Sequence, residues 1–199
     1  MNVLVTGGQG DLAKYITTTL IELGHTVDAP SRHELDVSSV DSVTTFFEAK
    51  HYDVVVNAAG TLYSSLVADS DPLLWIKDIE VNLIGSYLIC RAAVKANKSV
   101  KLINVASTAA FNSYKDWTSY CAAKAGVVTL SKGLYKDSYS VTVLCPGAIE
   151  TKLRNGLTID NPNVMTIAEG AAPILDAVIN DQNGKLVFYR KNEHREESL

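Results

Sequence analysis

Apolar residues follow two alternating patterns along this chain of 199 residues. Short runs rich in Val, Ile and Leu predict buried strands, at Val3–Thr6, His25–Ala29, Tyr52–Asn57, Val100–Val105, Val141–Leu144 and Lys185–Tyr189. Longer segments with apolar residues at helical spacing predict helices, at Asp11–Leu23, Ser38–Lys50, Asp71 to about Asn97, Trp117–Lys136 and Thr166–Asn180. This alternation predicts an α/β fold, a doubly wound parallel sheet with a layer of helices on each face.

Length and composition narrow the class of protein. The length fits one domain, at residues 1–190, and the charged segment 191–199 is expected to be a frayed tail. A net charge of −4 offers no basic patch to nucleic acid, and no apolar run is long enough to span a membrane. Three widely spaced cysteines, Cys90, Cys121 and Cys145, argue against a disulfide framework and a metal site. With no secretory signal, we expect a soluble cytoplasmic protein without a metal, nucleic-acid or membrane partner.

A glycine-rich turn, Thr6–Ala13, joins the first predicted strand to the first predicted helix. Glycine lets a phosphate approach the backbone closely, and the following helix offers free N–H groups and the positive end of its dipole. This context favours a dinucleotide site over a plain strand–helix turn, which is the alternative interpretation. The candidate cofactor-binding residues here are Gly7, Gly8, Gln9, Gly10, Asp11 and Leu12.

The end of the second predicted strand indicates which dinucleotide would bind. A carboxylate at this place would bind the ribose hydroxyl of NAD, whereas an arginine suits the extra phosphate of NADP. The chain has Ser31 and Arg32 here, and no acid at the strand end. The sequence therefore favours NADP over NAD, with an ordinary surface arginine as the alternative.

Tyr120 and Lys124 lie four residues apart in a predicted helix and therefore on one face. A neighbouring ammonium lowers the pKa of a tyrosine hydroxyl, which brings it closer to the working range of a general acid or base. Alone, this spacing is common by chance, as two residues on a helix surface. Ser107 strengthens the case, because it follows a predicted strand at the sheet edge where ligands bind and can donate to a substrate oxygen.

Further candidates fall at or near the same edge of the sheet. Asn82 stands inside the predicted long helix, where asparagine is a poor helix former and needs a structural or functional reason. The segments after two other strands are rich in small residues, which leaves room for a cofactor and its nicotinamide. They supply Asn57, Ala58, Ala59, Gly60, Pro146, Gly147, Ile149 and Thr151.

Together these motifs resemble those of the short-chain dehydrogenase/reductase family, in its short single-domain branch with a Rossmann fold, over about Val3–Arg190. The resemblance implies a catalytic tetrad of Asn82, Ser107, Tyr120 and Lys124. Tyr120 would exchange a proton with a carbonyl or alcohol substrate, while Ser107 orients the substrate oxygen. Lys124 would lower the pKa of Tyr120 and hold the nicotinamide ribose, and Asn82 would support a water that links Lys124 to solvent.

The resemblance also implies the rest of the cofactor site and the assembly. It implies that Asp36 and Val37, after a third strand, contact the adenine. Asn57 and Gly60 would contact the middle of the cofactor, and Ile149 and Thr151 would contact the nicotinamide carboxamide. Members commonly pair through two long helices, so a homodimer or homotetramer is expected. The apolar residues on more than one face of Asp71–Asn97 and Trp117–Lys136 agree with this.

Two features depart from the family's pattern. Asp11 and Ala13 stand where the glycine-rich turn usually has its second and third glycines. Ala13 is compatible with close helix packing, and Asp11 is expected either to weaken the cofactor site or to cap the helix. The chain is also short after Thr151, where the segment that covers the substrate normally lies, which predicts an open pocket.

The sequence favours an NADP-preferring oxidoreductase that moves a hydride between nicotinamide and a carbonyl or alcohol. Two interpretations stay beside it: a cofactor-binding sensor or scaffold with little catalysis, and an epimerase or dehydratase of the family's extended branch. The intact set of Ser107, Tyr120 and Lys124 favours catalysis over sensing, and the chain is too short for the substrate domain of the extended branch. Candidates for the lining of the substrate pocket are Trp117, Phe111, Tyr114 and the loop Gly147–Met165.

Overall fold

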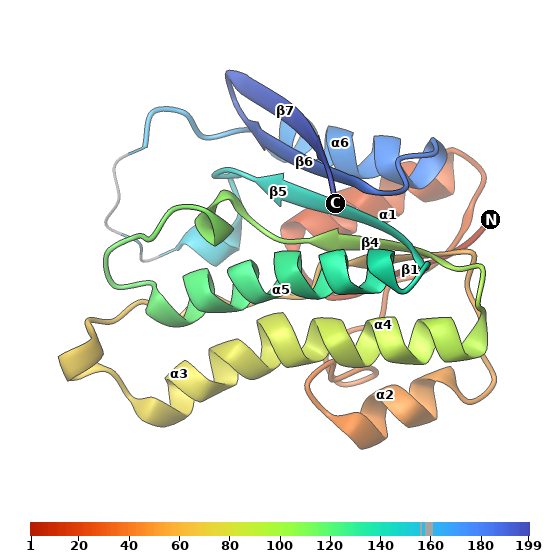
Figure 1. Ribbon diagram of the computed structural model, residues 1–199, viewed down its shortest axis with the longest axis horizontal. Coiled ribbons are helices and arrows are strands. Elements are labelled where there is room, and N and C mark those ends of the chain that lie inside the picture. The colour runs from red at the N-terminus through yellow and green to blue at the C-terminus, as the bar shows by residue number, and fades with distance from the viewer. Residues whose placement is uncertain (156, 158–160) are drawn as a thin grey trace.

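One seven-stranded sheet runs through the computed structural model of the chain (Figure 1), which describes residues 1–155, 157 and 161–199. The strand order is β2-β1-β3-β4-β5-β6-β7, and each neighbouring pair is parallel except β6 and β7. The strands are β1 (Asn2–Val5), β2 (Thr26–Asp28), β3 (Val54–Asn57), β4 (Lys101–Val105), β5 (Ser140–Pro146), β6 (Lys185–Arg190) and β7 (Glu193–Ser198). The chain moves outward from β1 to β2 and returns to β3 on the other side of β1, which opens a crevice at the carboxyl ends of these strands.

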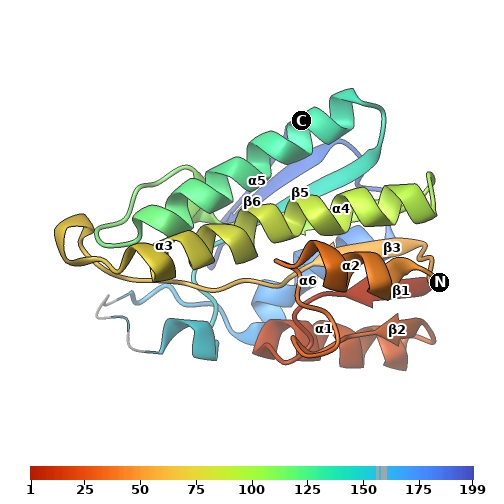
Figure 2. The same ribbon diagram turned by 90° about the horizontal axis from the view of Figure 1, so that it is seen from below.

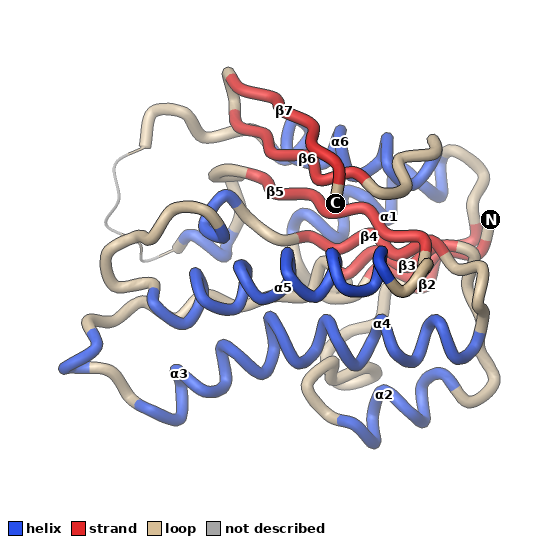
Figure 3. The backbone as a smooth tube through the Cα atoms, in the orientation of Figure 1, coloured by secondary structure: helices blue, strands red, loops and turns tan. Residues whose placement is uncertain are grey.

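Helices enclose this sheet on both faces (Figure 2). They are α1 (Asp11–Glu22) and α6 (Ile167–Ile179) on one face, and α2 (Val40–Phe47), α4 (Gly85–Ala96) and α5 (Thr118–Lys136) on the other, with α3 (Pro72–Ile79) leading into α4. The strands lie between the two groups of helices in the tube view (Figure 3). The predicted three-layer, doubly wound fold is therefore confirmed. Within the described residues, no helix combines the length and the apolar character needed to cross a bilayer.

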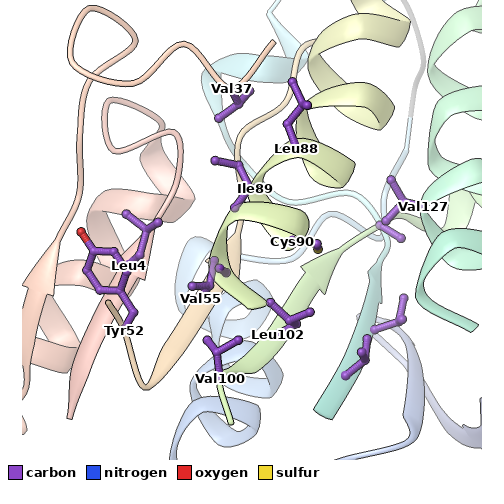
Figure 4. Close-up of a cluster of buried hydrophobic side chains, with 14 of the residues drawn as sticks. Leu4, Val37, Tyr52, Val55, Leu88, Ile89, Cys90, Val100, Leu102 and Val127 are labelled. Carbon is purple, nitrogen blue, oxygen red and sulfur yellow. The ribbon is translucent and has the colours of Figure 1, made fainter. Parts of the chain in front are cut away.

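Each face of the sheet has its own hydrophobic core, because the side chains of a strand point alternately to the two faces. Leu4 and Leu102 pack with side chains of α2, α4 and α5 (Figure 4), whereas Val3 and Ile103 pack with those of α1 and α6. The run Val54–Val56 is buried throughout, as expected for a parallel strand that is covered on both sides. This packing fixes the carboxyl ends of the strands and the loops that follow them.

The segment 191–199 is not a frayed tail, so this part of the prediction is wrong. It forms β7, which pairs antiparallel with β6 through six residue pairs. The side chains of β7 are exposed, but β6 pairs with its backbone, and Arg195 lies over the ring of Phe188, 4.3 Å from the centroid. Main-chain pairing with an edge strand depends little on side-chain polarity, which is why a charged segment is ordered here.

The long helix expected from Asp71 to about Asn97 is interrupted in its middle. α3 ends at Ile79 and α4 begins at Gly85, with a π-helical turn, η2 (Glu80–Ile84), between them. A π turn contains one residue more than an α-helical turn, and such turns are frequent at functional sites. Here the turn carries Asn82, whose side chain is fully buried.

Asp36 and Val37 follow β2 through a loop, and not a third strand as the resemblance implied. The Asp36 carboxylate accepts hydrogen bonds from the N–H of Ser38 at 3.0 Å and from its hydroxyl at 2.6 Å. This local turn competes with extended structure and directs the chain into α2.

Candidate active site

The loops that follow β1, β3, β4 and β5 meet at one edge of the sheet and enclose a cavity of about 310 Å³. Most of the predicted site residues line it: Gln9, Gly10, Asp11, Leu12, Ala58, Gly60, Ser107, Tyr120, Lys124, Pro146, Gly147, Ile149 and Thr151. Together with α5, which carries Tyr120 and Lys124, five separate segments of the chain thus contribute to one cavity, at the place where doubly wound sheets bind ligands. The cavity is therefore the candidate active site.

The other predicted site residues lie outside the cavity lining. They are Gly7, Gly8, Ser31, Arg32, Asp36, Val37, Asn57, Ala59 and Asn82. Asn57 is buried at the end of β3, where its amide donates to Asn104 Oδ1 at 2.8 Å and to Cys90 Sγ at 3.3 Å. These contacts tie β3 to β4 and α4, so Asn57 faces the core rather than the cavity.

The turn after β1 needs glycine at two positions. Gly7 has a positive φ of 73°, and a Cβ on it would lie 2.8 Å from Ala59 Cα. A Cβ on Gly8 would lie 2.1 Å from the carbonyl oxygen of Ala29. Both glycines lie on the side of the turn that packs against the loops after β3 and β2. The next residues of the turn face the cavity.

The first turn of α1 opens on the cavity without a side-chain cap. Its N-cap residue is Gly10, which has no side chain to accept from the first N–H groups of the helix. Such N–H groups have no partner within a helix, and with the helix dipole they form an anion site. A Cβ on Gly10 would meet only the carbonyl oxygen of Gly7, at 3.3 Å, so this side of the turn is open. The arrangement fits the pyrophosphate of a dinucleotide.

Asp11 does not cap α1, contrary to one expectation from the sequence. A capping side chain belongs to the residue before the first helical residue, which here is Gly10. The Asp11 carboxylate instead accepts a hydrogen bond from the N–H of Lys152 at 2.7 Å. Lys152 begins η4 (Lys152–Arg154), a short 3₁₀ turn after Thr151. Asp11 therefore joins the glycine-rich turn to the segment that follows β5.

The segment after Thr151 forms part of the cavity wall, so the pocket is partly covered on this side. Its described lining residues are Lys152, Leu153, Arg154, Leu157 and Asn161. The segment returns to the sheet at Met165, whose N–H donates to the carbonyl oxygen of Ala148 at 2.9 Å. The N–H of Glu150 donates to the carbonyl oxygen of Met165, also at 2.9 Å. These two bonds close the base of the loop.

Ser107 and Tyr120 face the cavity from neighbouring elements. Ser107 precedes η3 (Thr108–Ala110) at the end of β4, and its Oγ accepts a hydrogen bond from the N–H of Ala109 at 3.1 Å. That bond uses a lone pair, so the hydroxyl proton can still be donated to a substrate oxygen. Tyr120 comes from α5 and is 8% exposed. The ring of Trp117 packs edge-on against it, with centroids 6.1 Å apart, and restricts its orientation.

Lys124 lies one helical turn after Tyr120, on the same face of α5, as the spacing predicts. Its Nζ donates to the carbonyl oxygen of Val105 at 3.0 Å and lies 5.5 Å from the centre of the Tyr120 ring. The side chain is 5% exposed. The ammonium is thus held inside the site, at the end of β4.

Burial governs the proton affinities of this pair. Loss of hydration raises the pKa of Tyr120 to about 12, against a smaller lowering by the Ser107 hydroxyl. Burial lowers the pKa of Lys124 to about 8, although the negative charge of Asp78 raises it. The net shift of the Tyr120 pKa is therefore opposite to the lowering expected from Lys124, because desolvation dominates and the negative charge of Asp78 acts in the same direction.

Asn82 belongs to a buried polar cluster that the sequence did not predict. Its amide Nδ2 donates to the carbonyl oxygens of Thr61 and Asp78 and to Asp78 Oδ1, each at 2.9 Å. Asp78 also accepts from the hydroxyls of Thr61, at 2.6 Å, and Ser119, at 2.7 Å. The available signal was an acid placed one helical turn before Asn82 and so on the same face.

Arg32 lies beyond the cavity, in the turn after β2. The expectation of no acid at this strand end is wrong, because β2 ends at Asp28, whose carboxylate accepts a hydrogen bond from the Tyr52 hydroxyl at 2.6 Å. Its Nε is 3.5 Å from Asp36 Oδ2, and its side chain is 69% exposed. The hydrogen bond from the Ser38 hydroxyl, helped by the charges of Lys77 and Arg32, holds the pKa of Asp36 below its usual value. The ion pair keeps the guanidinium near the place where the extra phosphate of NADP is expected, and most of the side chain is accessible.

Two of the three aromatic residues expected in the pocket line the cavity. They are Tyr114 and Trp117, whose ring centroids are 5.1 Å apart. Phe111 does not line it, because it packs edge-on against Phe188 of β6, with centroids 5.8 Å apart. Leu62, from the loop after β3, completes the apolar part of the wall and had no distinguishing pattern in the sequence.

A model of the short chain dehydrogenase family matches residues 33–162, which is more than half of the chain. The chain belongs to the short-chain dehydrogenase family. The matched range contains Asn82, Ser107, Tyr120 and Lys124, and it begins after the glycine-rich turn. That turn is one of the two places in which the sequence departs from the pattern of the family.

Curated relatives of the family match the chain over part of their length. An uncharacterized oxidoreductase of Staphylococcus aureus (strain MRSA252) is 35% identical over 108 residues, which cover 51% of this chain and 47% of that protein. Trans-4-hydroxycyclohexanecarboxylate dehydrogenase of Sinomonas cyclohexanicum is 35% identical over 134 residues, which cover 62% of this chain and 52% of that protein. The chain thus spans about half the length of the curated relatives it matches.

A solved structure of the family shares the fold. The crystal structure of a short chain dehydrogenase from Burkholderia cenocepacia J2315, in complex with NADP, superposes with a TM-score of 0.82. The two sequences are 24% identical, and the match covers 92% of this chain and 85% of that chain. The two chains therefore share a fold.

Proposed function

We propose that the chain is an NADP-preferring oxidoreductase that moves a hydride between nicotinamide and a carbonyl or alcohol substrate. The observation that carries the proposal is that Ser107, Tyr120 and Lys124 share one cavity with the uncapped N-terminus of α1. One part of the cavity offers a proton donor and an orienting hydroxyl, and the other offers an anion site for a pyrophosphate. Hydride transfer to a carbonyl needs both parts side by side.

Ser107 and Tyr120 would act together on the substrate oxygen. The Ser107 hydroxyl, whose oxygen is held by the N–H of Ala109, can donate to that oxygen as negative charge develops on it. Tyr120 can deliver its proton to the same oxygen, because its raised pKa keeps it protonated at neutral pH until the charge develops. For alcohol oxidation, the same two groups would hold the hydroxyl and take up its proton.

The residues around the cavity indicate how the cofactor would be held. NADP, when bound, supplies or accepts the hydride. The N–H groups at the start of α1 would bind the pyrophosphate, Lys124 the nicotinamide ribose, and Ile149 and Thr151 the carboxamide. The preference for NADP rests on the exposed guanidinium of Arg32 after β2. The bound NADP of the Burkholderia relative is in accord with this choice.

The test is the steady oxidation of NADPH with a panel of aldehydes and ketones, followed by the absorbance of the reduced nicotinamide. The panel includes the keto form of 4-hydroxycyclohexanecarboxylate, because a curated relative is named for that alcohol. Turnover is expected with at least one compound, and Tyr120→Phe is the control that should abolish it. Tight NADPH binding without turnover of any compound would count against the proposal and favour a sensor.

We also propose that the chain pairs with a second copy of itself. Several large apolar side chains along α3, η2 and α4 are exposed, namely Leu73, Leu74, Ile76, Ile84 and Tyr87. Exposed apolar patches on soluble domains mark contact surfaces. Light scattering at micromolar concentration is expected to give the mass of a dimer or tetramer, and a monomer mass would contradict the proposal.

A further inference from the structure

A buried carboxylate, that of Asp78 in α3, lies near the proposed proton-transfer residues, and the mechanism above gives it no role. The residue is 2% exposed. A carboxylate in a protein interior costs free energy unless it is hydrogen-bonded and opposed by a positive charge. The contacts around Asp78 show what it interacts with.

The hydrogen bonds of Asp78 are those of an ionised group. The hydroxyl of Thr61 donates to Oδ1 at 2.6 Å, and the hydroxyl of Ser119 donates to Oδ2 at 2.7 Å. Such short O–H···O distances are typical of a charged acceptor. The amide Nδ2 of Asn82, which can only donate, is 2.9 Å from Oδ1. Each carboxylate oxygen thus receives donors, and the group carries a negative charge inside the protein.

Asn82 connects Asp78 to Lys124. The NH₂ group of its amide is taken up by Asp78 and Thr61, so its Oδ1 faces the other way, toward Gly60. The point that a Cβ on Gly60 would occupy is 2.9 Å from Asn82 Oδ1 and 3.7 Å from Lys124 Nζ. The amide oxygen and the ammonium therefore border the same small space, which the missing side chain of residue 60 keeps open.

Besides η2, which carries Asn82, four elements present polar or titratable groups to Lys124. α5 contributes the Tyr120 ring, β4 contributes the carbonyl oxygen of Val105, and β5 contributes Cys145. Burial raises the pKa of the Cys145 thiol to about 12, so this group is neutral near pH 7. α3 contributes Asp78, whose negative charge raises the pKa of Lys124 against the effect of burial. The same charge also raises the pKa of Tyr120.

We propose that Asp78 is the buried counter-charge and positioning residue of Lys124, and that it acts through the amide of Asn82. Its charge favours the ammonium form of Lys124, and its hydrogen bonds direct Asn82 Oδ1 toward that ammonium. With Asp78 ionised, Tyr120 and Lys124 both keep their protons near neutral pH. This is the state that donates a proton to a carbonyl, so the site is biased toward reduction. The inference rests on the proposed function.

Asp78→Asn removes the charge with little change in shape. An asparagine oxygen can keep the bonds from Thr61 and Asn82, and the Ser119 hydroxyl can turn to accept from the new NH₂ group. The readout is the affinity for NADPH as a function of pH, from the fluorescence of the bound reduced nicotinamide, which requires no turnover. Wild-type affinity is expected to fall as pH rises through about 8, where Lys124 loses its proton. In Asp78→Asn the fall should come about one pH unit lower, because the ammonium has lost its counter-charge.

Three further variants separate charge from structure. Glu80→Gln is the matched control, since Glu80 is a partly exposed acid close to Asp78 in sequence that pairs with Lys77 at 3.3 Å. It should leave the midpoint of the pH dependence in place. Asp78→Glu keeps the charge and should move the midpoint back toward that of the wild type. If Asp78→Asn does not fold, Asp78→Ser takes its place, and the midpoint of its NADPH affinity is expected to shift to lower pH in the same way.

The outcomes distinguish this inference from the proposed function. An unchanged midpoint in a folded Asp78→Asn or Asp78→Ser variant overturns the inference, even if affinity is lower at every pH, because that pattern indicates a structural role only. The proposed function then stands. If the wild type binds no NADPH at any pH, the proposed function fails and the inference fails with it. A shift to lower pH that Glu80→Gln does not share supports the role of Asp78.

Discussion

The two sides of the cavity are held in different ways. On one side, Lys124 and Asn82 are almost completely buried and fixed by hydrogen bonds to β4, to α3 and to the loop after β3. On the other side, the glycine-rich turn meets η4 through a bond between Asp11 and Lys152, at the protein surface. The family model matches the first side and η4, and it begins after the glycine-rich turn. The buried hydrogen bonds of the first side leave its residues little freedom, whereas the surface bond of the second side can change with less effect on the fold.

The largest effect is expected on the rate of catalysis, from Tyr120→Phe on the buried side of the cavity. The ring and its packing against Trp117 remain, but the proton donor is lost. The chemical step should slow by about 10²–10⁴-fold, the usual share of general acid–base catalysis. Single-turnover rates measure this loss, and an NADPH titration should show unchanged affinity. A wild-type rate in this variant would mean that the tyrosine is only structural.

Lys124→Ala should affect both sides, since the ammonium is expected on the cofactor ribose and beside Tyr120. NADPH affinity should fall at least tenfold, about 1.4 kcal/mol, and the rate should fall as well. Removing the positive charge destabilises the phenolate, so the basic limb of the pH–rate profile should move to higher pH. This direction is opposite to that expected for Asp78→Asn. Lys132→Ala, on the exposed part of α5, is the control and should change neither quantity.

Arg32→Ala tests the exposed residue that is expected to bind the adenosine end of the cofactor. The wild type is expected to bind NADPH at least tenfold more tightly than NADH, about 1.4 kcal/mol. The variant should reduce this ratio mainly by weakening NADPH, because the guanidinium is expected to contact the extra phosphate. Titrations with both dinucleotides measure the ratio, and Arg91→Ala, an exposed change on α4, should leave it unaltered. Equal wild-type affinities for the two dinucleotides would refute the assignment.

The smallest effect is expected from Asp11→Asn, at the joint between the glycine-rich turn and η4. An amide oxygen can still accept from Lys152, but the negative charge near the pyrophosphate site is gone. NADPH affinity should rise about threefold, while the free energy of unfolding falls by about 0.5 kcal/mol as the first turn of α1 loses an acid. Asp41→Asn, in the first turn of α2, should cause a similar stability loss with no change in affinity. Weaker NADPH binding by Asp11→Asn would show that the carboxylate supports the site.

The parts of the fold that the sequence predicts are those whose burial is local and continuous. The run Val54–Val56 needs cover on both faces wherever it lies, so a parallel strand follows from the run itself. β7 has no such pattern, because its order depends on pairing with β6. The π turn was missed because one extra residue hardly alters the spacing of apolar positions along the helix.

The site residues also divide into those that a local pattern predicts and those that depend on contacts between distant segments. Tyr120, Lys124 and Ser107 were found because each stands at a predicted helix face or strand end, where topology fixes the direction it faces. Asp78 was missed because an acid in a helix is by default at the surface. Its burial depends on Thr61 and Ser119, which lie far from it in sequence. The joint between Asp11 and Lys152 also depends on a contact between distant segments.

The π turn at Glu80–Ile84 also has a consequence for how the gene can change length. A π turn holds one residue more than an α-helical turn for nearly the same rotation. Removing one of its residues would therefore restore regular α-helical pairing and leave α3 and α4 facing almost the same way. α4 would keep its packing on the sheet through Leu88, Ile89 and Ala93, and the change would fall within the turn that carries Asn82. A single-codon deletion in this stretch is thus expected to preserve the fold while altering the position of Asn82 relative to Asp78.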